Sequence, residues 1–242
     1  MSWVGIMRKW IWRKILKPFL SLFLKSKCPI CDRPAKSELC LYCERQLFRC
    51  QFPGGGHQFP GEVPVFVWGE YKGSLKRAIA AMKYNDNPQL ARPLGHWLAE
   101  GWLNSPLSAV DKAIVVPIPM HRQKLKERGF NQAELLGKSF CEFAGLPLQG
   151  QGLERIKQTE ALYGLSKEKR ETTVKDAFVL GKGFRRRRVR RSVLLIDDIY
   201  TTGSTVNAAI ATLTKAGIKV AGVLAIATTN KETRGTREKS FD

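Results

Sequence analysis

Two kinds of apolar pattern alternate along the chain from residue 64 onward. Continuous runs of apolar and β-branched residues are typical of buried β-strands, and they occupy residues 64–71, 113–119, 192–198 and 219–228. Apolar residues at helical spacing occupy residues 74–84, 88–103, 131–144 and 204–216. Strands that alternate with helices at these lengths predict an α/β fold with a mostly parallel sheet flanked by helices.

The other segments differ from this region in composition. Residues 1–26 form a basic, tryptophan-rich arm, and residues 27–52 contain paired cysteines. The glycine- and proline-rich stretch 51–64 is predicted to be a linker. We therefore expect three parts, which are the arm at 1–26, a cysteine module at 27–52 and an α/β domain at 60–242.

The positive charge of the chain is large. Its 242 residues include 41 lysines and arginines against 21 aspartates and glutamates, a formal net charge of +20. Such a surface attracts polyanions, namely nucleic acid, anionic lipid or phosphorylated small molecules, although a basic face can also be solvated surface. Cations interrupt the apolar residues of the arm, so that no run approaches the roughly 18 residues of a membrane span. We expect a cytoplasmic protein, with peripheral contact to the inner membrane as the alternative.

Four of the six cysteines form two CxxC pairs separated by eight residues, and they are Cys28, Cys31, Cys40 and Cys43. Four thiolates from two knuckles match the tetrahedral ligand set of a structural Zn²⁺ ion. A redox dithiol would need only one such pair, which favours zinc. We expect Cys50 and His57 to lie outside the site and Cys141 to belong to the core.

Two adjacent acids, Asp197 and Asp198, end the predicted strand at 192–198 and are followed by a hydroxyl-rich turn and a helix. Open α/β sheets bind ligands at the carboxyl ends of their strands. Hydroxyls and free N–H groups at a helix N-terminus can hold a phosphate, and a glycine lets the backbone approach it closely. The predicted phosphate cradle consists of Thr201, Thr202, Gly203, Ser204 and Thr205. A helix cap beside two surface acids would explain the turn, but not paired acids that end a buried strand.

Two basic segments are further candidates for anion binding. Lys124, Lys126 and Arg128 lie in a predicted loop after the strand at 113–119, where they could neutralise a pyrophosphate or be solvated surface. A second cluster, directly before the strand with the paired acids, consists of Arg185, Arg186, Arg187, Arg188, Arg190 and Arg191. Arginine at this density suits phosphate backbones, and tryptophans interleave with cations in the arm, so we favour contact with nucleic acid over a solvated loop.

The stretch VLLIDDIYTTGST at 193–205 resembles the phosphoribosyl-pyrophosphate signature of type I phosphoribosyltransferases. The resemblance implies that Asp197 and Asp198 hold the ribose hydroxyls and that residues 201–205 bind the 5′-phosphate. It also implies a Mg²⁺ ion that bridges pyrophosphate and ribose oxygens. The string AMKY at 81–84, the stretch 115–132 and the cysteine pairs narrow the resemblance to the ComF competence family.

Members of the ComF family look like a short zinc-ribbon-like module joined to a phosphoribosyltransferase-like domain. The similarity covers residues 19–228, with Leu162 and Thr173 standing where glutamine and asparagine are usual. The family is linked to natural transformation, in which single-stranded DNA is taken up into the cytoplasm. The resemblance therefore implies DNA and proteins of the DNA-uptake machinery as partners.

Two functions are consistent with these features. In the first, the protein binds phosphoribosyl pyrophosphate and engages single-stranded DNA through its basic surface during DNA uptake. In the alternative, it is an active phosphoribosyltransferase that transfers phosphoribosyl to a nucleobase in nucleotide metabolism or salvage. We favour the first, because no base-binding hood can be identified and a charge of +20 exceeds what a base-salvage enzyme needs. No residue is assigned a catalytic role.

Overall fold

The computed structural model describes residues 27–59, 61–110, 112–157, 176–185 and 189–229. The chain divides into two compact units between Gln46 and Leu47. The predicted arm at 1–26, the two family departures at Leu162 and Thr173, and Arg186–Arg188 lie outside the described residues. Within the described ranges, no helix has the length and apolar character that crossing a membrane requires.

The first unit is built from two short knuckles. In the first knuckle, the N–H of Cys28 donates to the carbonyl of Arg33 at 2.8 Å, and the N–H of Asp32 donates to the carbonyl of Cys28 at 2.8 Å. Asp32 has a φ of +58°, which turns the chain tightly after the first cysteine pair. The second knuckle begins at Cys40 and continues directly into helix α3 (Leu41–Phe48).

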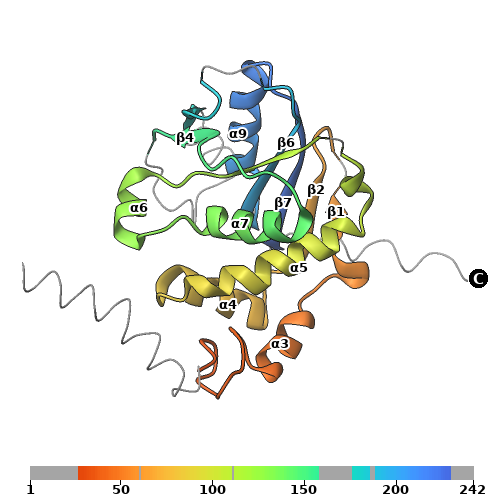
Figure 1. Ribbon diagram of the computed structural model, residues 1–242, viewed down its shortest axis with the longest axis vertical. Helices are drawn as coiled ribbons and strands as arrows, with labels where there is room; N and C mark the ends of the chain where they lie inside the picture. Colours follow the sequence, from red (N-terminus) through yellow and green to blue (C-terminus); the bar gives the residue numbers. More distant parts are fainter. Residues whose placement is uncertain (1–26, 60, 111, 158–175, 186–188, 230–242) are drawn as a thin grey trace, which may run out of the picture. The chain divides into compact units, whose positions relative to one another are not determined.

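A five-stranded sheet forms the centre of the second unit, with the strand order β1-β2-β7-β6-β3 (Figure 1). Only β1 is antiparallel among its described strands, since β2, β7, β6 and β3 are parallel to their neighbours. The strands are β1 (His57–Phe59), β2 (Val65–Glu70), β3 (Ile114–Pro117), β6 (Val193–Tyr200) and β7 (Val220–Thr228). The predicted α/β fold with a mostly parallel sheet is therefore confirmed.

Helices cover both faces of this sheet. Side chains alternate along a strand, and the odd-numbered β6 residues Val193 and Leu195 pack in one cluster with Val206 and Leu213 of α9. On the other face, a Cβ added at Gly137 of α7 would contact Val115 and Ile196, and α5 packs beside α7. The helices of this unit are α4 (Gly73–Tyr84), α5 (Ala91–Leu103), α6 (Arg122–Arg128), α7 (Gln132–Ala144) and α9 (Ser204–Lys215).

Several element boundaries differ from the sequence-based expectations. The predicted linker at 51–64 contains a 3₁₀ turn (Pro53–Gly55) and β1, because the edge of β2 offers β1 a pairing partner. The segment 88–103 splits into a 3₁₀ turn (Pro88–Leu90) and α5. The region 145–191, for which no element was predicted, contributes a two-stranded antiparallel sheet of β4 (Leu153–Arg155) and β5 (Phe178–Leu180). A further 3₁₀ turn spans Pro106–Ala109.

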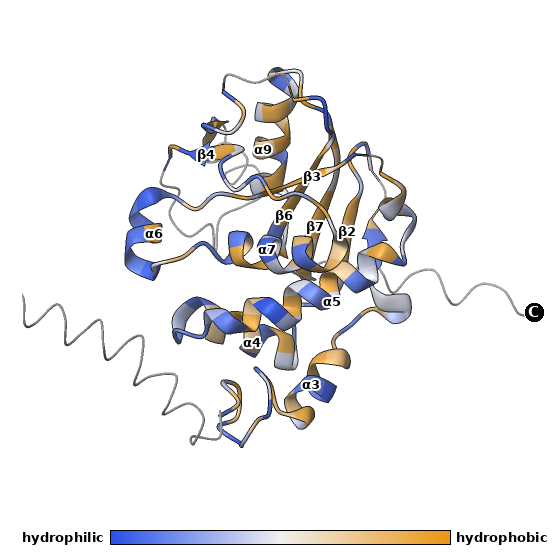
Figure 2. Ribbon diagram, viewed as in Figure 1, coloured by the Kyte–Doolittle hydropathy of each residue, from blue (hydrophilic) through white to orange (hydrophobic). Residues whose placement is uncertain are grey.

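The predicted basic loop at residues 122–128 is a helix, α6, and this expectation was wrong. Figure 2 shows it as predominantly hydrophilic, in contrast to the apolar central strands. Its residues are strong helix formers, and the ring of His121 accepts a hydrogen bond from the N–H of Gln123 at 3.4 Å, which caps its start. Gly129, with a φ of +83°, ends the helix in the left-handed region.

Candidate functional site

The four paired cysteines come together in the first unit. The sulfur atoms of Cys28, Cys31, Cys40 and Cys43 all lie within 4.8 Å of one another. The Cys31 and Cys40 sulfurs are 3.5 Å apart, and three of the four residues are buried. Local structure explains the convergence, because one knuckle is a tight turn and the other is the first turn of α3.

Electrostatics in the cluster favour a bound cation. Burial raises the pKa of Cys43, and the neighbouring thiols raise it further. The backbone N–H of Cys43 contributes most to lowering the pKa of Cys40, which falls to about 7. Four sulfurs at this spacing cannot all ionise without a positive charge between them, so the donor set fits a metal ion such as zinc.

The other cysteines have structural roles. Cys50 is buried in the second unit, where its thiol contacts the carbonyl oxygen of Lys72 at 3.5 Å. Cys141 is 7% exposed, and burial raises the pKa of its thiol to about 12. Cys141 therefore belongs to the core, as its position on the apolar face of the predicted helix indicated.

In the second unit, the paired acids lie near the end of β6 and face opposite sides of the sheet. Strand β6 continues past the predicted end at residue 198, because its pairing with β7 extends to Tyr200 opposite Thr228. Alternation along the strand places Asp197 on the α9 face and Asp198 on the face of α7. The two carboxylates therefore have different partners.

Asp198 is buried against two helices. Its Oδ2 atom forms an ion pair with Nζ of Lys83 at the end of α4, and its Oδ1 atom lies 3.5 Å from Nε2 of Gln132 on α7. Burial lowers the pKa of Lys83, but attraction to Asp198 outweighs burial, and the pKa lies above its ordinary value. The lysine therefore stays charged beside the carboxylate.

A chain of contacts continues from Asp198 to α6. Nη1 of Arg128 donates to Oε1 of Gln132 at 2.6 Å, and the guanidinium carbon of Arg128 lies 5.3 Å from the ring centre of Tyr84. Because Tyr84 follows Lys83 on α4, these contacts close a ring of five side chains around the edge of the sheet. Three parts of the chain that are distant in sequence are thereby linked, namely the end of α4, the junction of α6 and α7, and the carboxyl end of β6.

Asp197 has a different environment on the opposite face. Its Oδ1 atom accepts a hydrogen bond from the N–H of Asp198 at 2.8 Å. Although part of its surface remains exposed, desolvation raises its pKa well above the ordinary carboxyl value, and the charge of Asp198 adds to this effect. Arg155 on β4 is partly desolvated as well, and its charge interacts with that of Asp197.

The hydroxyl-rich turn at 201–205 follows β6 and opens α9. Thr201 and Thr202 are exposed, whereas Ser204 is buried and its hydroxyl lies 2.9 Å from that of Thr202. Gly203 precedes α9 with a φ of +77°, and a Cβ at this position would meet the Tyr200 hydroxyl oxygen at 2.8 Å. Glycine is required here for both reasons, and the first N–H groups of α9 are directed toward the turn.

A cavity of about 580 Å³ lies beside Asp198, between the end of α4 and α6. Two of the three predicted pyrophosphate cations line it, Lys124 and Arg128, whereas Lys126 is exposed and does not. Lys83 adds a third cation to the lining. Its remaining lining residues are Tyr84, Asp86, Glu127 and Phe130.

The described part of the predicted DNA-binding cluster lies at the other end of β6. Arg190 and Arg191 are exposed and precede the first residue of the strand, Val193. Arg185 follows β5, and its guanidinium group donates to the carbonyl of Leu180 at 3.1 Å and approaches Glu154 at 3.5 Å. The eight residues of β6, at about 3.3 Å per residue, separate this cluster from the hydroxyl-rich turn by about 23 Å.

Three residues of the site, Lys83, Tyr84 and Gln132, were not among the predicted site residues. Lys83 and Tyr84 belong to the string AMKY, which was noticed only as a family feature. Lys83 lies among apolar residues in the last turn of a predicted helix. This position could have indicated a site residue, because a buried cation requires an anionic partner. Gln132 carries no comparable signal.

Several curated proteins are similar in sequence to this chain. The chain is 28% identical over 204 residues to Competence protein F of Haemophilus influenzae, a match that covers 76% of this chain and 88% of that protein. DNA utilization protein YhgH of Escherichia coli is 25% identical over 187 residues, covering 74% of this chain and 80% of the relative. Competence protein ComFC of Streptococcus pneumoniae is 28% identical over 196 residues, covering 81% and 77%.

Similar solved structures include two adenine phosphoribosyltransferases. The protein from Leishmania tarentolae has a TM-score of 0.36 and 16% identity, covering 76% of this chain and 77% of that chain. The protein from Leishmania donovani has a TM-score of 0.36 and 12% identity, covering 84% and 87%. No family model matches the chain. The relatives named for competence each match about three-quarters or more of its length at 28% identity, and they support the resemblance of the chain to the ComF family.

Proposed function

We propose that this protein acts in the uptake and use of DNA, and that it binds phosphoribosyl pyrophosphate at one end of β6 and single-stranded DNA at the other. Relatives named Competence protein F and DNA utilization protein YhgH support the DNA part of the proposal. The observation that carries the ligand part is the paired acids of β6, which lead directly into the hydroxyl-rich turn at the start of α9.

Each part of this site suits one part of the ligand. The carboxylates of Asp197 and Asp198 accept hydrogen bonds from the ribose hydroxyls. The turn at 201–205 holds the 5′-phosphate with its hydroxyls and the N–H groups of α9. Lys124 and Arg128 neutralise the pyrophosphate from the neighbouring cavity, whose lining also includes the paired Lys83, and Lys126 lies outside this lining.

Two metal ions belong to the proposal. Mg²⁺ prefers hard oxygen ligands, and the pyrophosphate and ribose oxygens of the bound ligand would supply them, while Asp197 and Asp198 hold the ribose. When bound, it neutralises charge on the pyrophosphate. Zn²⁺ suits the four sulfurs of the first unit and stabilises the fold of that unit without taking part in ligand binding.

The ligand part is tested by thermal unfolding with Mg²⁺ and phosphoribosyl pyrophosphate. At a concentration of 100 times the Kd, the ligand stabilises the folded protein by about 2.7 kcal/mol, which raises Tm by about 5–11 °C in a protein of this size. The double variant Asp197→Asn/Asp198→Asn should lose this shift, whereas Glu142→Gln, an exposed acid ten residues along α7 from Gln132, should retain it. An equal shift in the double variant would show that the paired acids do not hold the ligand.

A further inference from the structure

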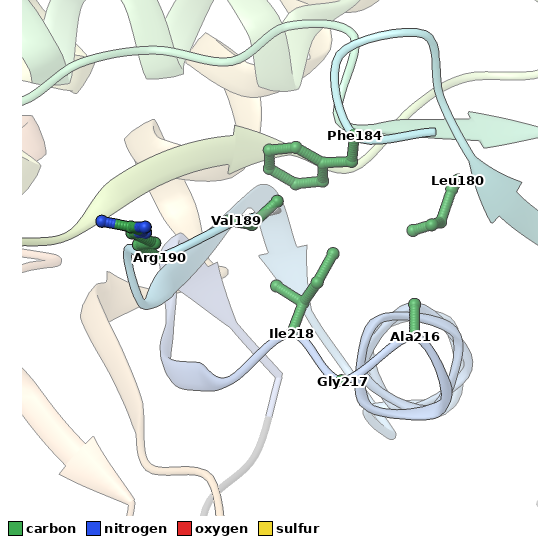
Figure 3. A pocket seen from close by; sticks show the side chains of 7 residues that line it. All are labelled: Leu180, Phe184, Val189, Arg190, Ala216, Gly217 and Ile218. Carbon is green, nitrogen blue, oxygen red and sulfur yellow. The ribbon is translucent and has the colours of Figure 1, made fainter. Parts of the chain in front are cut away.

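A cleft lined mainly by apolar side chains lies beside the described arginines, at the amino end of β6. It has a volume of about 500 Å³ and is formed by the segments around β5, the entry to β6 and the turn after α9. Figure 3 shows the side chains of Phe184, Val189 and Ile218 converging on it, with Leu180 and Ala216 on the side of α9. Arg190 is the one charged residue in its lining and extends from its edge.

Exposed cations lie at, or within two residues of, the lining residues on three segments of the chain. Among the described residues, none of them forms an ion pair with a carboxylate, in contrast to Arg185, which approaches Glu154. These cations are Lys182, Arg190, Arg191, Lys215 and Lys219. A patch of unpaired cations next to an apolar cleft complements a ligand that carries an apolar group between negative charges.

We propose that this cleft receives a nucleobase of single-stranded DNA while the surrounding cations hold the flanking phosphates. The proposal rests on the DNA-binding part of the proposed function and adds a site for the base. A base presents a flat apolar face to aliphatic and aromatic side chains, and stacking on such side chains tolerates any sequence. The cleft is therefore expected to bind single strands without sequence preference.

Single strands are preferred over duplexes by this arrangement. In a duplex, each base is paired and stacked, and moving it out of the helix costs several kcal/mol. The base of a single strand is free to enter the cleft without that cost. An anionic lipid shares the charge and the apolar group, but the name of the relative DNA utilization protein YhgH refers to DNA and favours the nucleic acid.

The test compares oligonucleotides that differ only in their bases. Fluorescence anisotropy is measured with a 12-residue thymidine oligonucleotide, with an abasic oligomer of the same length and with a duplex. The variant Ala216→Leu fills the cleft from the end of α9 without changing charge, since Ala216 is exposed and lines it. Ala211→Leu is the matched control, because Ala211 is exposed on the same helix but lines a different groove.

The wild-type protein should bind the thymidine oligonucleotide about tenfold more tightly than the abasic oligomer, and Ala216→Leu should abolish this preference. The slope of log K against log salt should not change, because the phosphate contacts remain. Ala211→Leu should behave as wild type. Circular dichroism verifies that both variants are folded.

Three results would overturn the inference or its basis in different ways. Equal affinity of the wild-type protein for the two oligomers would show that no base binds in the cleft. An undiminished preference of Ala216→Leu for the thymidine oligonucleotide would show the same. Neither result would contradict the proposal that the protein binds DNA. No binding of either oligomer would overturn the DNA part of the proposed function itself. Binding to phosphatidylglycerol vesicles that Ala216→Leu weakens, with oligonucleotide binding unchanged, would assign the cleft to lipid.

Discussion

Lys83 forms an ion pair with Asp198, and only 16% and 6% of their side chains are exposed. The pair joins the last turn of α4 to the strand that carries the paired acids. Because both charges are removed from water, neither can lose its partner without a large cost. In the proposed function, Lys83 also lies beside the pyrophosphate, so that ligand binding and the stability of the sheet edge depend on the same contact.

Replacing Lys83 by methionine should destabilise the protein strongly. The methionine keeps much of the length of the side chain but leaves the carboxylate of Asp198 buried without a cation, a change that costs about 3–5 kcal/mol. The expected decrease in Tm is about 6–20 °C. Differential scanning calorimetry measures it, and the double variant Lys83→Met/Asp198→Asn should recover most of the loss. An unchanged Tm in Lys83→Met would mean that the pair contributes little.

Asp197→Asn should have the opposite effect on the ligand-free protein. Because burial raises its pKa in the folded state, the folded protein holds this proton more tightly than the unfolded chain. The resulting stability is complete below the ordinary carboxyl pKa and is lost as the pH rises through the raised value. At pH 8 the asparagine should therefore raise Tm, by about 2–4 °C for each kcal/mol of relieved desolvation.

The gain from Asp197→Asn should shrink as the pH is lowered and Asp197 takes up its proton. Thermal unfolding between pH 4 and pH 8 measures this dependence. Asp198→Asn is the matched control on the neighbouring residue, and it should lower Tm at pH 8 because it removes the partner of Lys83. A gain that is independent of pH would contradict the assignment of the shift to Asp197.

The double variant Arg190→Ala/Arg191→Ala should weaken binding of single-stranded DNA across all sequences. Each lost phosphate contact should reduce the slope of log K against log salt by about 0.7. Arg185→Ala should have a smaller effect, because its guanidinium group already donates to the carbonyl of Leu180. Salt titrations of oligonucleotide binding measure the slopes.

Phosphoribosyl pyrophosphate should still bind to the Arg190→Ala/Arg191→Ala variant with wild-type affinity, since the hydroxyl-rich turn lies at the opposite end of β6. Isothermal titration calorimetry provides this comparison. Wild-type DNA affinity and slope in this variant would identify the two arginines as solvated surface.

Cys43→Ser should release the metal from the first unit, whereas Cys50→Ser should retain it. The sulfur of Cys43 belongs to the four-cysteine cluster, while that of Cys50 contacts the backbone of Lys72. Elemental analysis of protein purified without chelator should find about one Zn²⁺ per chain in the wild type and in Cys50→Ser. Metal-free wild-type protein would refute the zinc assignment.

Local patterns in the sequence determined the order of most helices and strands in the second unit. The apolar runs at 113–119 and 192–198 identified β3 and β6, because a buried parallel strand needs apolar side chains on both faces. Asn131 begins the predicted helix at 131–144, and its side chain caps α7 by accepting a hydrogen bond from the N–H of Ala133 at 3.1 Å. The spacing of the two CxxC pairs likewise predicted that their four sulfur atoms lie close together.

Where local signals compete, the tertiary structure decided the outcome. Strand β1 lies in a stretch rich in glycine and proline, and it forms because the exposed edge of β2 supplies backbone hydrogen bonds. Helix α6 has too few apolar residues to show helical periodicity, although its lysines, glutamate and arginines favour a helix. Charge alone suggested a loop at this position.

The partners of the paired acids could be found only in the tertiary structure. The sequence places Asp197 and Asp198 side by side, but alternation along β6 directs them to opposite faces of the sheet. The helices packed on each face determine which charged groups lie beside each acid. These helices come from segments that are far from β6 along the chain. Lys83 reaches Asp198 because α4 and β6 meet at one edge of the sheet, and no local pattern encodes that meeting.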